Sequence, residues 1–103
     1  MNAASAAVVL GTLKAVWPDA VAEHKFCATR KWRFDFAIPS HMIAIEVNGA
    51  IWTAGRHSRG SGLIKEYEKM RAAAILGWRV MPFATDEIRL IPSLVHSAIT
   101  TKP

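Results

Sequence analysis

The 103-residue chain has a single cysteine and no long run of apolar side chains. One cysteine, Cys27, cannot form an internal disulfide or a cysteine zinc cluster, and it fits a reducing compartment. No apolar stretch approaches the roughly 20 residues that cross a bilayer, so we expect no membrane partner. The first ten residues lack a basic region ahead of their apolar stretch, which favours a short amphipathic helix over a signal peptide. These absences predict a cytoplasmic protein.

Acidic residues are also scarce, with 8 Asp and Glu against 13 Lys and Arg and a net charge of +5. On a small surface this excess predicts a polyanionic partner, nucleic acid in preference to a membrane. The apolar share of 51 % is that of an ordinary globular protein. The length permits one modest core, so residues 1–103 are expected to form a single domain.

Hydrophobic periodicity predicts seven elements along the chain. The expected segments are a helix at 3–16, strands at 21–28, 32–38 and 42–48, a helix at 63–76, a strand at 78–84, and a final helix at 85–99 that Pro92 interrupts or restarts. The order α-β-β-β-α-β-α predicts an α/β fold in which helices flank a small mixed sheet.

The same patterns predict which side chains face the core. The expected apolar stripes are Ala7, Leu10, Leu13 and Val16 on the first helix and Leu63, Tyr67, Met70 and Ala74 on the second. Alternation in the strands groups Phe34, Phe36 and Ile38 on one face, and Ile43, Ile45 and Val47 on one face. Gly77 and Thr85 are expected as helix caps, a C-terminal and an N-terminal one respectively. Core or interface positions are expected for Trp17, Trp32, Trp52 and Trp78, with Trp52 also a possible base-stacking residue.

Two acidic side chains stand out in the central strands. If Ser40 and His41 form the tip of a tight hairpin, Asp35 lies directly across from Glu46. Directly opposed carboxylates repel each other, and burying them is unfavourable unless a positive group binds between them. Their hard oxygen ligands favour Mg²⁺ or Mn²⁺ over zinc. The alternative is that one carboxylate simply pairs with Arg33 or Lys31 at a solvated edge.

The pattern Arg33-Phe34-Asp35-Phe36, a short turn, and then Ile45-Glu46-Val47-Asn48-Gly49 resembles the PD-(D/E)XK nuclease superfamily. The resemblance spans roughly residues 23–83, and the strings Gly55-Arg56-His57, Glu68-Lys69 and Gly77-Trp78-Arg79 are similar to small nucleases of phages and prophages. Residues 49–52 are faintly similar to very-short-patch repair endonucleases. The resemblance implies a restriction-endonuclease-like core. It also implies that Asp35, Glu46 and the backbone carbonyl of Val47 hold magnesium.

One position departs from that pattern. The family's lysine, two residues after the glutamate, is replaced here by Asn48, and a neutral amide cannot stabilise developing negative charge as an ammonium does. Some family members supply this lysine from the following helix, which makes Lys69 the candidate, with Lys65 one turn earlier. Both could equally be solvated helix charges. Glu23, on the first strand, is a further candidate ligand, directly or through water, or a surface charge.

Basic residues supply the expected DNA contacts. The glycine-containing loop with Arg56, His57 and Arg59 leads into a helix N-terminus, an arrangement that favours phosphate binding. Further phosphate contacts are expected from Arg30, Lys31, Arg33 and Lys65, whose alternative role is that of ordinary solvated charges.

Taken with the resemblance, these residues predict a metal-dependent DNA endonuclease of a bacterial or phage-infected cell. No sequence-reading module is evident, so recognition of DNA structure is expected, with Holliday junction resolution in DNA recombination as the best fit. Two paired cuts would require a homodimer. The alternatives are a monomeric nicking or mismatch-directed endonuclease, and a nuclease-fold DNA-binding protein without catalysis.

Overall fold

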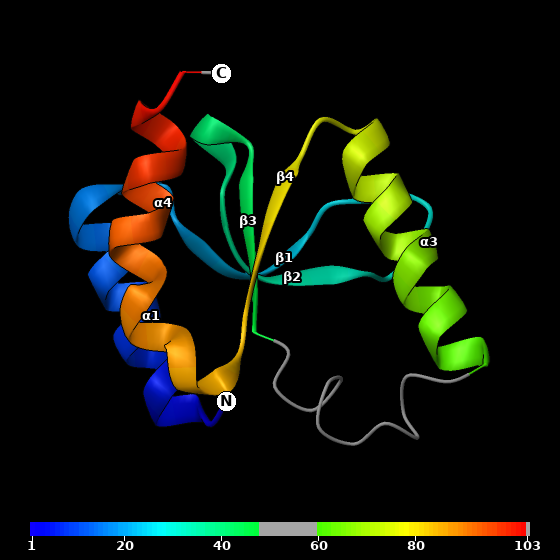
Figure 1. Cartoon of the computed structure of the whole chain (residues 1–103), viewed down its shortest axis with the longest axis horizontal. Coiled ribbons are helices and arrows are strands. Elements are labelled where there is room, and N and C mark those ends of the chain that lie inside the picture. The colour runs from blue at the N-terminus through cyan, green and yellow to red at the C-terminus, as the bar shows by residue number, and fades with distance from the viewer. Residues whose placement is uncertain (48–59, 103) are drawn as a thin grey trace.

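The computed structural model describes residues 1–47 and 60–102. Within these two ranges the helices and strands, labelled in Figure 1, run in the order α-β-β-β-α-β-α, with two short 3₁₀ helices between them. Their bounds are α1 Ala3–Val16, β1 Val21–Lys25, β2 Arg33–Ile38, η1 Pro39–His41, β3 Ile43–Val47, α3 Ser61–Ile75, β4 Arg79–Phe83, η3 Thr85–Leu90 and α4 Ile91–Thr100. The predicted α/β order is confirmed.

The four strands form one mixed sheet in the order β1-β2-β3-β4. β1, β2 and β3 are successively antiparallel, and β4 lies parallel to β3. Phe36 pairs with Ile45 and Ile38 with Ile43, which is the register predicted from a turn centred on Ser40 and His41. The turn itself is η1, and Met42 leaves it in the left-handed conformation.

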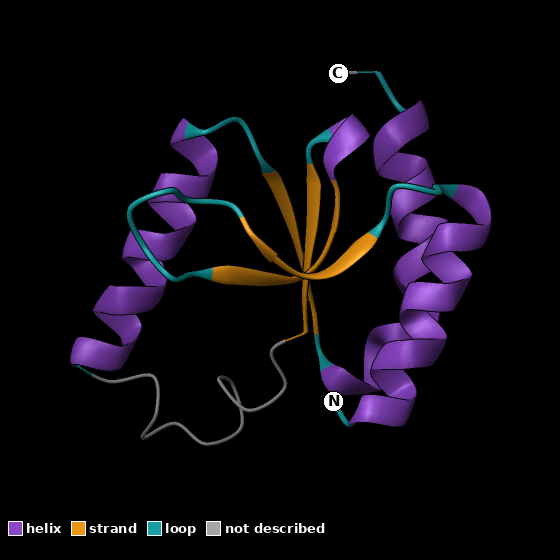
Figure 2. Cartoon of the chain, turned by 180° about the vertical axis from the view of Figure 1, so that it is seen from behind, coloured by secondary structure: helices purple, strands orange, loops and turns teal. Residues whose placement is uncertain are grey.

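The helices form a layer on each face of the sheet (Figures 1 and 2). α1 and α4 cover one face and bury the larger part of the core, which includes Leu13, Phe36, Ile45 and Val95. α3 covers the other face, where Ala73 packs with a smaller group of side chains: Phe34, Ala37 and Ala44. Each helix therefore buries one face against the sheet, as expected for two layers packed on a sheet.

The first helix has the predicted bounds but a different buried stripe. Its N-cap is Asn2, whose side chain accepts a hydrogen bond of 2.8 Å from the backbone N–H of Ser5. Val9 and Leu13 are buried, whereas Ala7 and Val16 are exposed, so the prediction was wrong for those two. The helix is apolar on almost every side, and periodicity alone cannot select one face of such a sequence.

The predicted alternation fails in β2. Phe36 and Ile38 face α1 and α4, but Phe34 packs on the α3 side with Ala37. The β2–β3 ladder ends at Phe36, and in β1 the neighbouring Glu23 adopts a positive φ of 49°. A local distortion of this kind redirects side chains, as a bulge does. The strict alternation of side chains between the two sheet faces is therefore interrupted at Asp35 in β2.

The stripe predicted for the second helix was wrong at three of its four positions. Tyr67, Met70 and Ala74 are exposed, while Ala73 is buried and Lys69 is partly buried on the same side. A lysine and an alanine one turn apart form the inward face because the sheet below presents Glu46 and large aromatic rings. Gly77 follows the helix with a φ of 90°, as predicted for a C-cap glycine.

The last segment contains a 3₁₀ helix followed by α4, which begins next to Pro92 as predicted. Thr85 is not the N-cap: the cap is Ala84, whose backbone N–H donates to Glu87 Oε1 at 2.9 Å. Within the two described ranges, no helix is both long enough and apolar enough to cross a membrane.

Candidate active site

The carboxylates of Asp35 and Glu46 each accept a backbone hydrogen bond from the opposite strand, just beyond the end of the β2–β3 ladder. The backbone N–H of Asp35 donates to Glu46 Oε2 at 3.0 Å, and the backbone N–H of Val47 donates to Asp35 Oδ2 at 2.7 Å. Each carboxylate thus replaces a ladder hydrogen bond of the opposite strand. The two acidic groups are held close together at the point where β2 and β3 separate.

Glu46 is the buried member of the pair, with 3 % of its surface exposed. Burial raises the pKa of its carboxyl group, and the nearby negative charge of Asp35 raises it further. The hydrogen bonds from Lys69 and from the Asp35 backbone act in the opposite direction and lower the pKa. Glu46 is the only buried charged residue in the part of the chain that the structure describes.

Lys69 of α3 provides the neighbouring positive charge. Its Nζ forms a salt bridge and a hydrogen bond with Glu46 Oε1, and its side chain is 14 % exposed. The Phe34 ring centroid lies 5.9 Å from the same Nζ, so the ammonium is enclosed by a carboxylate and an aromatic ring. Lys65, one turn earlier, is exposed. Of the two candidate lysines, the structure brings Lys69 to the acidic pair.

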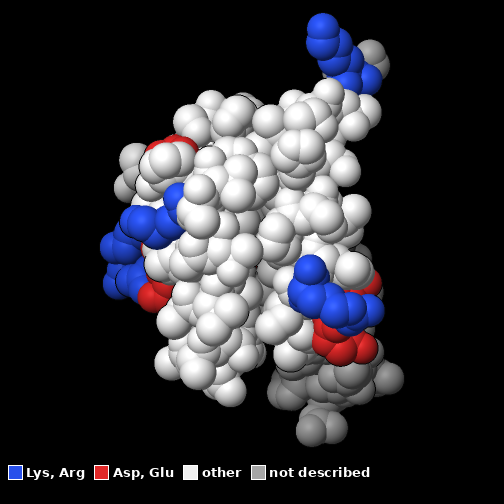
Figure 3. Space-filling model, turned by 90° about the vertical axis from the view of Figure 1, so that its left-hand side faces the viewer, with Lys and Arg blue, Asp and Glu red and all other residues white. Residues whose placement is uncertain are grey.

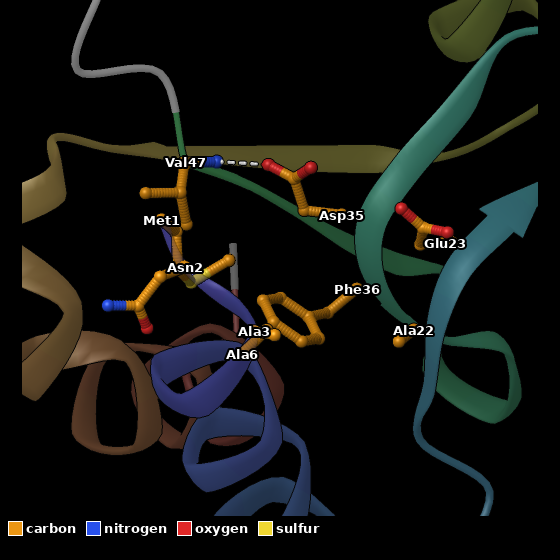
Figure 4. Close-up of a pocket in the computed structure, with 9 residues that line it drawn as sticks. All are labelled: Met1, Asn2, Ala3, Ala6, Ala22, Glu23, Asp35, Phe36 and Val47. Carbon is orange, nitrogen blue, oxygen red and sulfur yellow. Dashed lines mark hydrogen bonds between the residues drawn. The ribbon is translucent and has the colours of Figure 1, made fainter.

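Asp35 also lines an open cleft of about 460 Å³ between α1 and the sheet (Figure 4). The cleft residues are Met1, Asn2, Ala3, Ala6, Ala22, Glu23, Asp35, Phe36 and Val47. Figure 4 shows the Asp35 carboxylate directed toward the backbone nitrogen of Val47, with Glu23 on the neighbouring strand. Glu46 does not line this cleft but pairs with α3, so the two carboxylates are approached from different layers.

Glu23 lies on the first strand, as predicted, and β1 is the neighbour of the Asp35 strand, β2. Its side chain is 75 % exposed and forms an ion pair of 3.6 Å with Arg33. Its positive φ of 49° is uncommon for a residue other than glycine, and such strain often occurs at functional sites. Glu23 therefore joins the rim of the cleft as an exposed acidic group, with Arg33 held against it.

The other predicted DNA contacts are placed only in part. Arg30 pairs with Glu68 of α3 at 3.5 Å, and Lys31 is exposed in the loop between β1 and β2. Arg56, His57 and Arg59 lie outside the described residues, as do Asn48 and Trp52. Of the predicted DNA contacts, those that the structure places therefore lie around the β1–β2 loop and on α3.

The residues present fit a hard divalent cation in their donor chemistry. The carboxylates of Asp35 and Glu46 and the carbonyl of Val47 are oxygen donors of the kind that such a cation takes, and an ionised carboxylate has about four acceptor positions, more than the described bonds use. Among residues 1–47 and 60–102, no group of three or more His, Cys, Asp or Glu side chains gathers to hold a metal. A cation here would rely on the acidic pair and backbone oxygen.

One feature of this region was not predicted. Phe26, Trp32 and Phe34 stack in front of Lys69, with Arg30 over the Trp32 ring. The prediction for Trp32 was a core or interface position, and the structure leaves it half-buried. A hairpin register between β1 and β2 would have indicated the stack, because it places Phe26 opposite Trp32.

A comparison with known protein families, curated proteins and solved structures found no match to this chain.

Proposed function

We propose that the protein is a metal-dependent endonuclease that hydrolyses phosphodiester bonds in DNA. The observation that carries the proposal is the group formed by Asp35, Glu46 and Lys69. Each carboxylate accepts a hydrogen bond from a backbone N–H of the other strand, that of Asp35 or of Val47, and a lysine from the covering helix reaches the more buried carboxylate. Buried ionisable groups with a perturbed pKa are frequent in catalytic sites.

Asp35, Glu46 and the Val47 carbonyl would hold Mg²⁺ or Mn²⁺. When bound, the cation supplies a Lewis acid for the phosphate and lowers the pKa of a water molecule. The protein's own groups then have separate roles. Asp35 faces the open cleft and is accessible to a phosphate, while Glu46 is fixed by the Asp35 backbone and keeps the strand ends in place.

Lys69 would take the role of the lysine that Asn48 replaces. An ammonium beside the acidic pair can stabilise the negative charge that develops on the phosphate as a water oxygen bonds to phosphorus and a bridging P–O bond breaks. The contact with Glu46 aligns the lysine before DNA arrives. Lys65 is exposed one turn away and would contact the phosphate backbone.

The distribution of charged residues favours DNA binding on one side of the molecule. The face formed by α1 and α4 is largely uncharged, with Lys and Arg as well as Asp and Glu at its margins (Figure 3). α4 contains no Lys, Arg, Asp or Glu, and α1 contains only Lys14. DNA would therefore approach the β1–β2 loop, α3 and the acidic pair. The uncharged face would be available for a second copy, as paired cutting of a Holliday junction requires.

The decisive experiment is a cleavage panel. A labelled four-way junction, a linear duplex of the same sequence and a single strand are each incubated with the protein in Mg²⁺ and in EDTA. We expect Mg²⁺-dependent cuts, with paired symmetric cuts in the junction. Cutting of the duplex alone, by a chain with monomer mass, would favour a nicking endonuclease instead. Cleavage that persists in EDTA would overturn the metal mechanism.

A second candidate is a DNA-binding protein that uses this fold without catalysis. The favouring observation is that both Glu46 oxygens already accept hydrogen bonds from protein donors, Lys69 and the Asp35 backbone. In that case the acidic residue serves the fold alone. The panel would then show retarded DNA and no product with Mg²⁺ or Mn²⁺.

A further inference from the structure

Aromatic side chains form a continuous stack on the α3 side of the sheet. The ring centroids of Phe26 and Phe34 lie 4.0 Å apart and are nearly parallel, at 6°. Phe26 and Trp32 are also nearly parallel, at 13°, with centroids 6.2 Å apart. Trp78, itself half-buried, meets Phe34 edge-on at 5.2 Å. Four rings thus support one another, and two of them extend from the buried Phe34 toward the β1–β2 loop.

Burial decreases from Phe34 toward the β1–β2 loop. Phe34 is fully buried, Phe26 and Trp32 are half-buried, and Arg30 lies over the Trp32 ring with its Cζ 4.0 Å from the centroid. The Arg30 side chain is 47 % exposed, and its ion pair of 3.5 Å with Glu68 anchors it to α3. The stack therefore ends at the surface in a guanidinium and an indole whose positions are fixed by neighbours. We call this pair the Arg30–Trp32 platform.

The platform lies between two exposed basic residues and the candidate active site. Lys31 is exposed between the two platform residues in sequence, and Arg33 is exposed just after them. At the buried end, the Phe34 ring lies 5.9 Å from Lys69 Nζ, which contacts Glu46. Flat π surfaces flanked by cations match the alternation of base and phosphate along a nucleic acid strand.

We propose that the Arg30–Trp32 platform binds an unpaired base of single-stranded DNA. The base stacks on the outer side of the Arg30 guanidinium, which the Trp32 ring supports from behind, because Phe26 and Arg30 already lie against the indole. Bases inside a duplex are already stacked and are not accessible to such a plane. Lys31 contacts the adjoining phosphate. The inference rests on the proposed DNA substrate and names its preferred form: a strand with unpaired bases near the cut, as at a branch point.

The test separates base stacking from charge. Fluorescence polarisation in EDTA, where metal-dependent cutting cannot occur, compares a labelled single strand with the same strand carrying consecutive abasic sites. Both strands have identical phosphates. We expect the intact strand to bind about fivefold or more tightly than the abasic one, in line with the stabilisation from one stacked base.

Arg30→Lys is the informative variant because it keeps the positive charge and an ion pair with Glu68 but removes the plane. It should lose the preference for the intact strand, and Trp32→Leu should do the same. Lys31→Gln is the matched control. It should weaken the binding of both strands by the same factor and retain the preference for the intact strand. Urea unfolding of each variant checks that the domain remains folded.

Equal binding of the two strands by the wild-type protein, or a full preference in Arg30→Lys, would overturn the platform assignment. Tighter binding of an RNA strand of the same sequence would overturn the choice of DNA. These failures are distinct from failure of the nuclease proposal. If the protein cuts DNA with Mg²⁺ but binds intact and abasic strands equally, only the platform proposal is rejected. If it prefers intact strands but never cuts, only the catalytic proposal is rejected.

Discussion

The backbone N–H of Asp35 donates a hydrogen bond of 3.0 Å to the carboxylate of Glu46, one strand away. The neighbouring bond, from Val47 N–H to Asp35 Oδ2, runs in the opposite sense between the same strands. Side chains thereby replace the backbone ladder where β2 and β3 separate. Substitutions in this pair should therefore affect both chemistry and local structure, and isosteric changes are needed to tell the two apart.

Asp35→Asn should abolish Mg²⁺-dependent cleavage while leaving the fold intact. The amide oxygen can still accept the bond from Val47, but it lacks the charge that a divalent cation requires. We expect the cleavage rate to fall by at least about 100-fold, since even residues beyond the ligands of metal sites contribute up to that much. Single-turnover cleavage assays measure it.

Asp19→Asn is the control for Asp35→Asn. Asp19 also accepts a backbone hydrogen bond, from Ser40 N–H at 2.8 Å, but lies at the opposite end of β2. Cleavage by Asp19→Asn should equal that of the wild-type protein. If both variants cut normally, the assignment of Asp35 as a metal ligand is wrong.

Lys69→Met should destabilise the domain as well as impair cleavage. Methionine retains most of the apolar stem but leaves the Glu46 carboxylate buried without its cation. Removing one partner of a buried pair typically lowers the free energy of unfolding by about 3 kcal/mol. Urea denaturation monitored by tryptophan fluorescence provides the measurement.

The double variant Glu46→Gln/Lys69→Met shows whether the loss arises from an unpaired charge. It should be more stable than Lys69→Met alone, because a neutral amide is less costly to bury than a carboxylate. Lys65→Met, which alters an exposed lysine on the same helix, should leave stability near the wild-type value. A double variant less stable than Lys69→Met would contradict the pairing argument.

The raised pKa of Glu46 predicts a specific pH dependence of stability. Burial raises this pKa above its ordinary value of 4.5, so the folded chain holds the proton more tightly than the unfolded chain does. Between 4.5 and the raised value, the folded state binds more protons, and the free energy of unfolding falls as pH rises. Below 4.5 the contribution is constant, and above the raised pKa the loss is complete.

Compared with Glu46→Gln, the wild-type protein should therefore lose stability as pH rises from 4.5, as measured by urea midpoints at each pH. Mg²⁺ should reduce the difference between the two proteins, because a bound cation favours the ionised carboxylate. Parallel curves for the two proteins at all pH values would show that burial does not perturb Glu46.

Val8→Glu tests the proposed dimer. Val8 is 69 % exposed on α1 and lines an open groove with Ile88, Pro92 and, at its edge, the basic Arg89. A charge there would face an apolar partner surface, so we expect the mass in solution to fall from dimer to monomer. Ile75→Glu, at an 84 % exposed site on α3, should retain the dimer. Sedimentation equilibrium that finds monomeric wild-type protein at all concentrations would refute the homodimer.

Sequence patterns were sufficient for the order of the elements and for the β2–β3 register. They succeed because strand alternation and hairpin geometry are local properties, and the turn at residues 39–41 fixes which residues face each other. The same logic brought Asp35 next to Glu46. The bonds that join them were not predictable, because they depend on where the ladder ends.

The orientation of α3 shows what a single sequence leaves open. Tyr67 and Met70 are more hydrophobic than Lys69, so hydrophobic periodicity predicted the wrong side of the helix as the buried one. The choice is made by the sheet, where Glu46 attracts the ammonium and Phe34 leaves space only for a small side chain such as Ala73. An electrostatic contact between distant segments therefore overrides the local pattern.

The same chemical change, glycine to alanine, should have opposite effects at two positions. Gly77 has a φ of 90°, which an L side chain adopts only with strain, although the nearest atom to an added Cβ, Met42 Cε, is 3.8 Å away. Gly77→Ala should therefore lower the free energy of unfolding by about 1 kcal/mol.

Gly11 lies inside α1 with open space around it, and Gly11→Ala should raise the free energy of unfolding by about 1 kcal/mol, because alanine restricts the unfolded chain. Urea denaturation of both variants, at concentrations where each has the wild-type mass, checks the signs. Stabilisation by Gly77→Ala would mean that the turn after α3 does not require the left-handed conformation.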